Sequence, residues 1–147
     1  MNPELEDLYQ EVILDHSRRP RNFGHLSDAA VRVHGDNPAC GDEIDLDVKF
    51  GEDGSLQDLK FSGHGCAISQ ASASMMTDML KGRTAAEADR LMTGFLHLVK
   101  GEDASDLPED DRERLEVMGG ISEFPMRVKC ATLAWHTYKN AVEEGAT

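Results

Sequence analysis

The feature that most constrains the fold is a series of three short segments in which apolar and polar residues alternate. Val31 and Val33 have polar neighbours, segment 44–50 places Ile, Leu, Val and Phe at alternate positions, and segment 59–64 follows the same period. This alternation is typical of strands with one buried face. Turn residues at 51–54 can join the second and third segments as a hairpin. We therefore expect a three-stranded antiparallel meander.

Segments with helical periodicity precede and follow these strands in the sequence. The first expected helix runs from Pro3 to His16, and its apolar stripe consists of Leu5, Leu8, Val12 and Ile13. Later helices are expected from Cys66 to just before Gly82, after a capping box formed by Thr84 and Glu87, from about Glu109, and from Pro125 onward. Strands followed by helices indicate an α+β domain, with the sheet packed on one side by helices.

The length and the charge of the chain limit the number of domains and the kinds of partner. The 147 residues suit a single domain, 1–147, with an acidic insertion at about 101–118. A net charge of -13 argues against nucleic acid as a partner, because phosphate binding needs clustered Lys and Arg. No apolar run is long enough to span a membrane, and no secretory signal is evident at the N-terminus. We expect a cytoplasmic protein with reduced thiols.

Three cysteines in a chain with few of them carry the functional signal. Cys40 lies in a Gly-bounded loop, Cys66 precedes a helix, and Cys130 comes from the last helix. With Asp42, two residues after Cys40, they offer three thiolates and one carboxylate. Such a set can close a tetrahedral shell around zinc or hold a thiolate-ligated iron centre.

The local sequence distinguishes these four positions from ordinary ones. The positive end of a helix stabilises a thiolate at Cys66, and glycines beside Cys40 and Cys66 leave room for a bound atom. A single cysteine such as Cys130 is more often a small buried hydrophobe. We interpret His64 as a residue near the ligands and not as a ligand. Three acidic neighbours of Asp42 are interpreted as solvated side chains: Glu43, Asp45 and Asp47.

Three motifs resemble the IscU/SufU family of iron–sulfur assembly proteins, also called NifU N-terminal-like. They are segment 37–42 (Asn-Pro-Ala-Cys-Gly-Asp), segment 63–72, which contains Gly-His-Gly-Cys-Ala-Ile-Ser, and segment 127–135, which begins Arg-Val-Lys-Cys-Ala-Thr. The likeness extends from about Leu5 to Val142. It implies a SufE/IscU-like fold, which agrees with the sheet and helices expected from periodicity.

The same resemblance favours the SufU branch. IscU scaffolds carry His before the third cysteine and a Leu-Pro-Pro-Val-Lys chaperone motif upstream, whereas this chain has Lys129 and the segment 124–129 (Phe-Pro-Met-Arg-Val-Lys). The insertion at about 101–118 is similar to that of the SufU branch. The likeness implies that Cys40, Asp42, Cys66 and Cys130 bind Zn²⁺. It also implies that sulfur comes from a pyridoxal-phosphate cysteine desulfurase of the SufS type.

Three functional hypotheses follow. In the first, a zinc-dependent sulfurtransferase receives persulfide sulfur on Cys40 and passes it to downstream Suf assembly proteins or apo-proteins, with Arg127 near the ligands. In the second, the same ligands form a scaffold on which a [2Fe–2S] cluster is assembled and handed to apo-proteins. In the third, the chain is a non-catalytic domain with structural zinc. We favour the first, because a Gly-bounded loop lets Cys40 move toward a donor.

Overall fold

The computed structural model describes residues 3–28, 31–104 and 106–145. Its sheet has the order β1-β2-β3, formed by β1 (Val31–Asn37), β2 (Asp42–Phe50) and β3 (Leu56–His64). Both pairings are antiparallel, with Val33 opposite Leu46 and Leu46 opposite Phe61. The expected meander is confirmed, and its strands continue beyond the alternating segments to the residues that carry the site.

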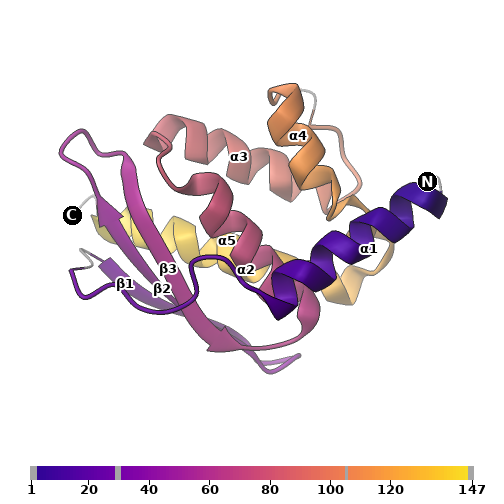
Figure 1. The fold of residues 1–147 in the computed structure, drawn as a ribbon, viewed down its shortest axis with the longest axis horizontal. Coiled ribbons are helices and arrows are strands. Elements are labelled where there is room, and N and C mark those ends of the chain that lie inside the picture. The colour runs from indigo at the N-terminus through magenta and orange to yellow at the C-terminus, as the bar shows by residue number, and fades with distance from the viewer. Residues whose placement is uncertain (1–2, 29–30, 105, 146–147) are drawn as a thin grey trace.

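Within the described residues, six helical segments accompany the sheet (Figure 1). They are α1 (Pro3–Arg18), α2 (Ala67–Leu80), α3 (Ala85–Leu98), α4 (Glu109–Glu116), the short 3-10 helix η1 (Gly119–Glu123) and α5 (Pro125–Gly145). Helix α3 begins with the expected capping box, in which Thr84 and Glu87 each accept a hydrogen bond from the other's backbone N–H. The side chains of Leu5 and Leu8, part of the expected stripe of α1, lie outside the described residues.

The helices cover one face of the sheet. Helices α2 and α5 pack directly on the strands, while α1 lies against α2 (Figure 1). The apolar strand residues that were expected to face inward are buried at alternate positions, among them Val31, Val33, Ile44, Leu46, Val48, Leu59 and Phe61. In the helical layer, the rings of Phe95 and Trp135 stack with centroids 4.6 Å apart. The expected α+β class and its one-sided helical cover are confirmed.

One acidic residue on β2 differs from the sequence interpretation. Asp47 was expected to be solvated, but only 2% of its surface is exposed. The loop before β1 crosses this part of the sheet, so that the backbone N–H of Leu26 donates to Asp47 Oδ2 at 2.8 Å. Arg32 and His25 also lie within ion-pairing distance of that oxygen. The interpretation was wrong because local alternation cannot show that a distant loop covers an outward-facing side chain.

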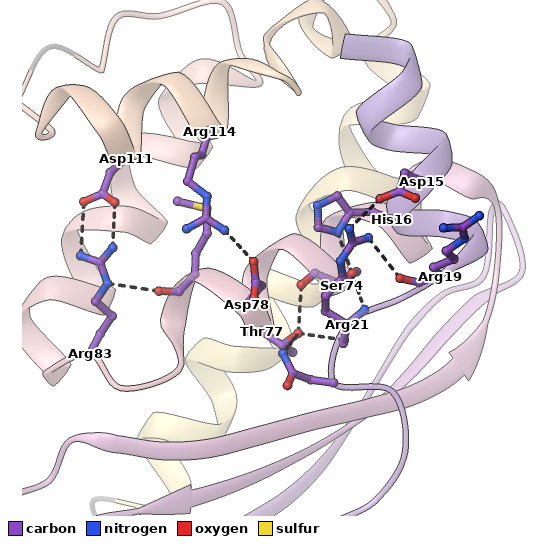
Figure 2. Close-up of polar contacts among 12 residues, drawn as sticks. Asp15, His16, Arg19, Arg21, Ser74, Thr77, Asp78, Arg83, Asp111 and Arg114 are labelled. Atoms are coloured by element: carbon purple, nitrogen blue, oxygen red, sulfur yellow. Dashed lines mark hydrogen bonds and ion pairs between the residues drawn. The ribbon is translucent and has the colours of Figure 1, made fainter. Parts of the chain in front are cut away.

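Polar contacts fix the end of α1 on α2. Nδ1 of His16 lies 2.7 Å from Oγ of the fully buried Ser74, and the backbone N–H of Arg21 donates to the same oxygen at 2.8 Å (Figure 2). The Arg21 guanidinium pairs in turn with Asp15. Since α1 forms one wall of a groove beside the cysteines, these contacts help to set the shape of the site.

Candidate metal and sulfur site

The loop between β1 and β2 presents Cys40 to solvent. Asn37 ends β1, and its carbonyl oxygen accepts hydrogen bonds from the backbone N–H groups of Cys40 at 3.1 Å and Gly41 at 2.9 Å. Gly41 has φ +73°, a left-handed conformation that a residue without Cβ adopts at little cost. The turn therefore holds the Cys40 thiol at an exposed tip and starts β2 at Asp42.

Asp42 is completely buried, and only one of its carboxylate oxygens has a hydrogen-bond partner. The backbone N–H of Cys66 donates to Oδ1 at 2.9 Å, whereas Oδ2 has no partner among the described residues. A buried polar atom left without a partner costs on the order of 1–3 kcal/mol, and more when the group is charged. A buried oxygen of this kind is suited to bind a cation.

Cys66 is the N-cap of α2, as the sequence indicated. Its sulfur accepts a hydrogen bond from the backbone N–H of Ser69 at 3.5 Å, so the thiol lies at the positive end of the helix. A Cβ on the preceding Gly65 would come within 2.5 Å of Asp42 Oδ1. Glycine at this position therefore allows the strand-to-helix junction to approach the carboxylate.

Cys130 faces the same place from α5 and has no exposed surface. Burial raises the pKa of the Cys130 thiol, and the neighbouring Asp42, Cys40 and Cys66 raise it further. The side-chain amide of Asn37 points toward its sulfur, with an Nδ2 to Sγ distance of 4.0 Å. A cation bound at this position would favour the thiolate of Cys130 over the thiol, because a bound metal stabilises the thiolate form.

The fold brings three of the four predicted ligands together and places the fourth, Cys66, next to them. One donor atom from each of Cys40, Asp42 and Cys130 lies within 4.8 Å of the other two. Cys66 adjoins this group, since its backbone binds Asp42 and its thiol acts on Cys130. Three sulfurs and an unpartnered carboxylate oxygen, drawn from a loop, a helix start and a second helix, match the donor set that zinc accepts.

The two other residues singled out from the sequence have different positions. His64 is 74% exposed by its side chain and lies 2.7 Å from Glu43 Oε2, on the sheet face that the helices leave open. Arg127 lines the same cavity as Cys66, and the thiols of Cys130 and Cys66 raise the pKa of its guanidinium. Arg127 is therefore beside the sulfurs, whereas the described contact of His64 is directed away from them.

The sequence analysis did not anticipate a groove whose lining includes Cys66. Its lining comes from α1, from the start of α2 and from residues 117–127. Of its apolar lining residues, Ile13 was assigned only to a helix face, because spacing along one helix does not show which neighbouring surface a side chain meets. Phe124, within a motif that had already been quoted, was the one signal that could have revealed this surface.

Fold and site together place the chain in a known family. The model of the NifU-like N-terminal domain matches residues 8–144, and the chain belongs to this family, which includes the IscU and SufU proteins of iron–sulfur cluster assembly.

Relatives of this chain are named either as sulfurtransferases or as scaffold proteins. The chain is 43% identical over 146 residues to the zinc-dependent sulfurtransferase SufU of Bacillus subtilis strain 168, with 98% of this chain and 97% of the relative covered. It is 42% identical to the iron–sulfur cluster assembly scaffold protein IscU of Streptococcus pyogenes serotype M1, covering 97% and 87%. The crystal structure of a SUF-system scaffold protein from Fervidobacterium islandicum AW-1 superposes with a TM-score of 0.83 at 34% identity, covering 93% and 98%.

No helix among the described residues is both long and apolar enough to cross a lipid bilayer.

Proposed function

We propose that this protein is a zinc-dependent sulfur acceptor, which takes persulfide sulfur from a SufS-type, pyridoxal-phosphate cysteine desulfurase for iron–sulfur cluster assembly in the cytoplasm. The observation that carries the proposal is the buried, unpartnered Oδ2 of Asp42 beside three cysteines, of which only Cys40 is exposed. The similarity to SufU of Bacillus subtilis supports it.

The proposed zinc ligands are Cys40, Asp42, Cys66 and Cys130. When bound, zinc would supply the positive charge that keeps the thiols deprotonated and orders the loop. Asp42 also holds the backbone of Cys66 through Oδ1, which couples the β2 start to the α2 start. Arg127 adds a fixed positive charge next to Cys66 and Cys130.

Cys40 is the proposed sulfur acceptor. Its thiolate attacks the outer sulfur of the donor persulfide and forms a new S–S bond on Cys40. The donor's S–S bond breaks, and its electron pair leaves on the inner sulfur as the desulfurase thiolate. No external oxidant or reductant is needed. The sulfur then passes to downstream Suf assembly proteins or to apo-proteins. Exposure suits Cys40 for this role, since Cys130 is fully buried.

The test measures cysteine-dependent turnover by the cognate desulfurase with and without the zinc-loaded protein, together with mass spectrometry of Cys40. We expect stimulation and one added sulfur on Cys40. Cys40→Ala should abolish both, while Ala39→Ser, which changes the adjacent exposed turn residue, should retain both. No stimulation and no added sulfur on the wild-type protein would contradict the proposal.

A second candidate function uses the same donors. Three thiolates and Asp42 could hold a [2Fe–2S] cluster that is assembled here and passed to apo-proteins, and the Streptococcus relative named as a scaffold supports this alternative. Anaerobic reconstitution with iron and sulfide distinguishes the two. A visible chromophore that transfers to an apo-ferredoxin, together with failure of the desulfurase assay, would favour the scaffold.

The alternative of a non-catalytic domain with structural zinc makes a different prediction. If zinc only held the fold, chelation would unfold the chain and the desulfurase would not respond to it. In the described part of the chain, the hydrophobic core contains 30 buried apolar residues that do not include the cysteines. We therefore expect the chelated protein to keep its far-ultraviolet circular dichroism spectrum.

A further inference from the structure

Two histidines and two carboxylates gather on the open face of the sheet, apart from the cysteines. His34 on β1 lies opposite Asp45 on β2, and Glu43 on β2 lies opposite His64 on β3. Side chains at such positions are close neighbours, because their Cβ atoms are about 4.5–5.5 Å apart. Glu43 is exposed on the opposite side of β2 from its buried neighbour Asp42. The cluster is therefore separate from the proposed zinc ligands.

The four side chains form a connected series. Nδ1 of His34 lies 2.8 Å from Asp45 Oδ1. Nε2 of the same ring lies 3.9 Å from Glu43 Oε1, and Glu43 Oε2 lies 2.7 Å from Nε2 of His64. The first and last contacts have the length of hydrogen bonds, whereas the contact between His34 and Glu43 is too long to be one.

The contact with Asp45 fixes the proton of the His34 ring. An ionised carboxylate only accepts hydrogen bonds, so Nδ1 of His34 carries the proton. In the neutral ring Nε2 then has a free lone pair, and an oxygen of Glu43, which also can only accept, lies 3.9 Å from it. A cation fits between two such acceptors, because metal–nitrogen and metal–oxygen bonds are each about 2.0–2.2 Å long. Histidines that bind metals commonly donate their other N–H to a carboxylate in this way.

The charges around the cluster favour a cation. The hydrogen bond with Asp45 is the main cause that raises the pKa of His34, and the negative charges of Asp45, Glu43 and Asp36 raise it further. In the described part of the chain, no lysine or arginine forms an ion pair with any of these three carboxylates. The four side chains of the cluster are each at least 47% exposed, so an ion can reach them from solvent.

We propose that this face of the sheet binds a divalent first-row transition ion through Nε2 of His34, a carboxylate oxygen of Glu43 and Nε2 of His64. Asp45 is a positioning residue that holds the ring of His34. Two imidazoles and one carboxylate form a donor set that is used by non-haem Fe²⁺ sites, so Fe²⁺ is the expected ion. The site shares no donor with the cysteine cluster, and both can be filled at once.

The experiment titrates Fe²⁺, under anaerobic conditions, and in parallel Co²⁺ into the zinc-loaded protein. Zinc keeps the cysteines occupied, because a given site binds Zn²⁺ more tightly than Fe²⁺ or Co²⁺. Isothermal titration calorimetry gives the stoichiometry and the Kd. Broadening of backbone amide signals by the paramagnetic Co²⁺ locates the ion on the chain.

The variants separate ligands from the positioning residue. His34→Gln and Glu43→Gln each remove a ligand, and Asp45→Asn changes the contact that holds the ring. His97→Gln is the matched control: His97 on α3 is also an exposed histidine beside a carboxylate, with Nδ1 3.3 Å from Glu102 Oε1, but it lies outside the cluster. Circular dichroism checks that each variant is folded.

We expect one additional ion per zinc-loaded chain, with broadening centred on residues 34, 43 and 64. His34→Gln and Glu43→Gln should each weaken binding at least tenfold, and Asp45→Asn should weaken it by on the order of tenfold. His97→Gln should bind as the wild type. Equimolar Mg²⁺ should not compete, because it prefers oxygen ligands to imidazole.

Four results would overturn the proposal. The first is no binding beyond the zinc, and the second is wild-type affinity in folded His34→Gln and Glu43→Gln. Competition by equimolar Mg²⁺ would indicate a general acidic surface that makes no use of imidazole. Thiolate-to-cobalt charge-transfer absorption, without broadening around residue 34, would place the ion at the cysteines.

Discussion

Asp42 and Asp111 are both buried, but their carboxylates differ in their hydrogen-bond partners. Asp111 on α4 receives two hydrogen bonds from Arg83, at 2.7 Å and 3.3 Å, one to each carboxylate oxygen (Figure 2). The partnership raises the pKa of the Arg83 guanidinium. Arg114 of the same helix pairs with Asp78 of α2. Asp42, by contrast, has one backbone donor and a buried oxygen with no described partner.

The difference separates a carboxylate with a complete set of partners from one that can still accept a ligand. Asp111 and Arg83 attach α4 to the helical layer through a pair that is complete within the chain. Oδ2 of Asp42 has no described partner, which is consistent with the proposed role of Asp42 as a metal ligand. A buried carboxylate oxygen without a hydrogen-bond partner is a stronger indication of function than an acidic side chain alone, because acidic residues are abundant in this chain.

The largest effect should come from Asp42→Ala. Removing a residue that merely supports a metal ligand costs about 10–100-fold in affinity, so the loss of a ligand should weaken zinc binding by on the order of 100-fold or more. Competition with a chromophoric chelator measures this. The free energy of unfolding of the metal-free protein should change little, because removal of the unpartnered Oδ2 offsets the loss of the hydrogen bond from the Cys66 backbone N–H to Oδ1. If Asp42→Ala bound zinc as tightly as the wild type, the distinction drawn between Asp42 and Asp111 would be refuted.

Asp111→Ala should lower the free energy of unfolding and leave zinc affinity nearly unchanged, which is the reverse of the pattern expected for Asp42→Ala. Arg83 would lose its bidentate partner while remaining partly exposed, so we expect a loss of about 1–3 kcal/mol in the free energy of unfolding. Urea titration of the metal-free protein measures it. Zinc affinity should stay within about twofold. A large loss of zinc affinity would show that the insertion and the metal site are coupled.

Gly65→Ala tests whether the junction before α2 must approach Asp42. The added Cβ would displace the carboxylate that it meets at 2.5 Å, and we expect roughly tenfold weaker zinc binding. Gly119→Ala is the matched control, because its Cβ would meet no atom within 4 Å. If both variants bound zinc equally well, Asp42 would tolerate movement and its geometry would not be the determinant.

The smallest effect concerns pH and the attachment of α1. Burial lowers the pKa of His16, and the nearby Arg21 lowers it further. The unfolded chain therefore binds more protons near pH 6.5, so the stability contributed by neutral His16 is complete above pH 6.5 and is lost as pH falls toward the folded pKa. His16→Gln should be less destabilised than wild type on acidification from pH 7.5 to 5.5.

His34 provides the matched comparison for this titration. The hydrogen bond with Asp45 raises its pKa, so its contribution is present below pH 6.5 and is lost as pH rises through the folded pKa. His34→Gln should therefore differ from wild type mainly at the acidic end, in the destabilising direction. Thermal unfolding at several pH values measures both variants. The same pH slope in His16→Gln and wild type would exclude His16 as a contributor.

Much of the fold was predictable because its signals are local. Alternation identified the strands, and Thr84 with Glu87 marked the start of α3, since capping uses residues three apart. The positions of Cys40, Cys66 and Cys130 relative to turn and helix starts were also readable. Asp47 was misinterpreted because the covering loop, at Leu26, lies 21 residues away in sequence.

The sequence by itself determined the strands, the main helices, the family and four candidate donor residues, because periodicity, turn residues and ordered motifs are properties of short segments. Only the tertiary structure decided that Asp42 is fully buried with an unpartnered oxygen, that Arg127 lies beside the thiols and His64 turns away, and that an apolar groove begins at Cys66. The physical reason is that burial and approach depend on side chains from segments far apart in the chain, whose packing no local pattern encodes.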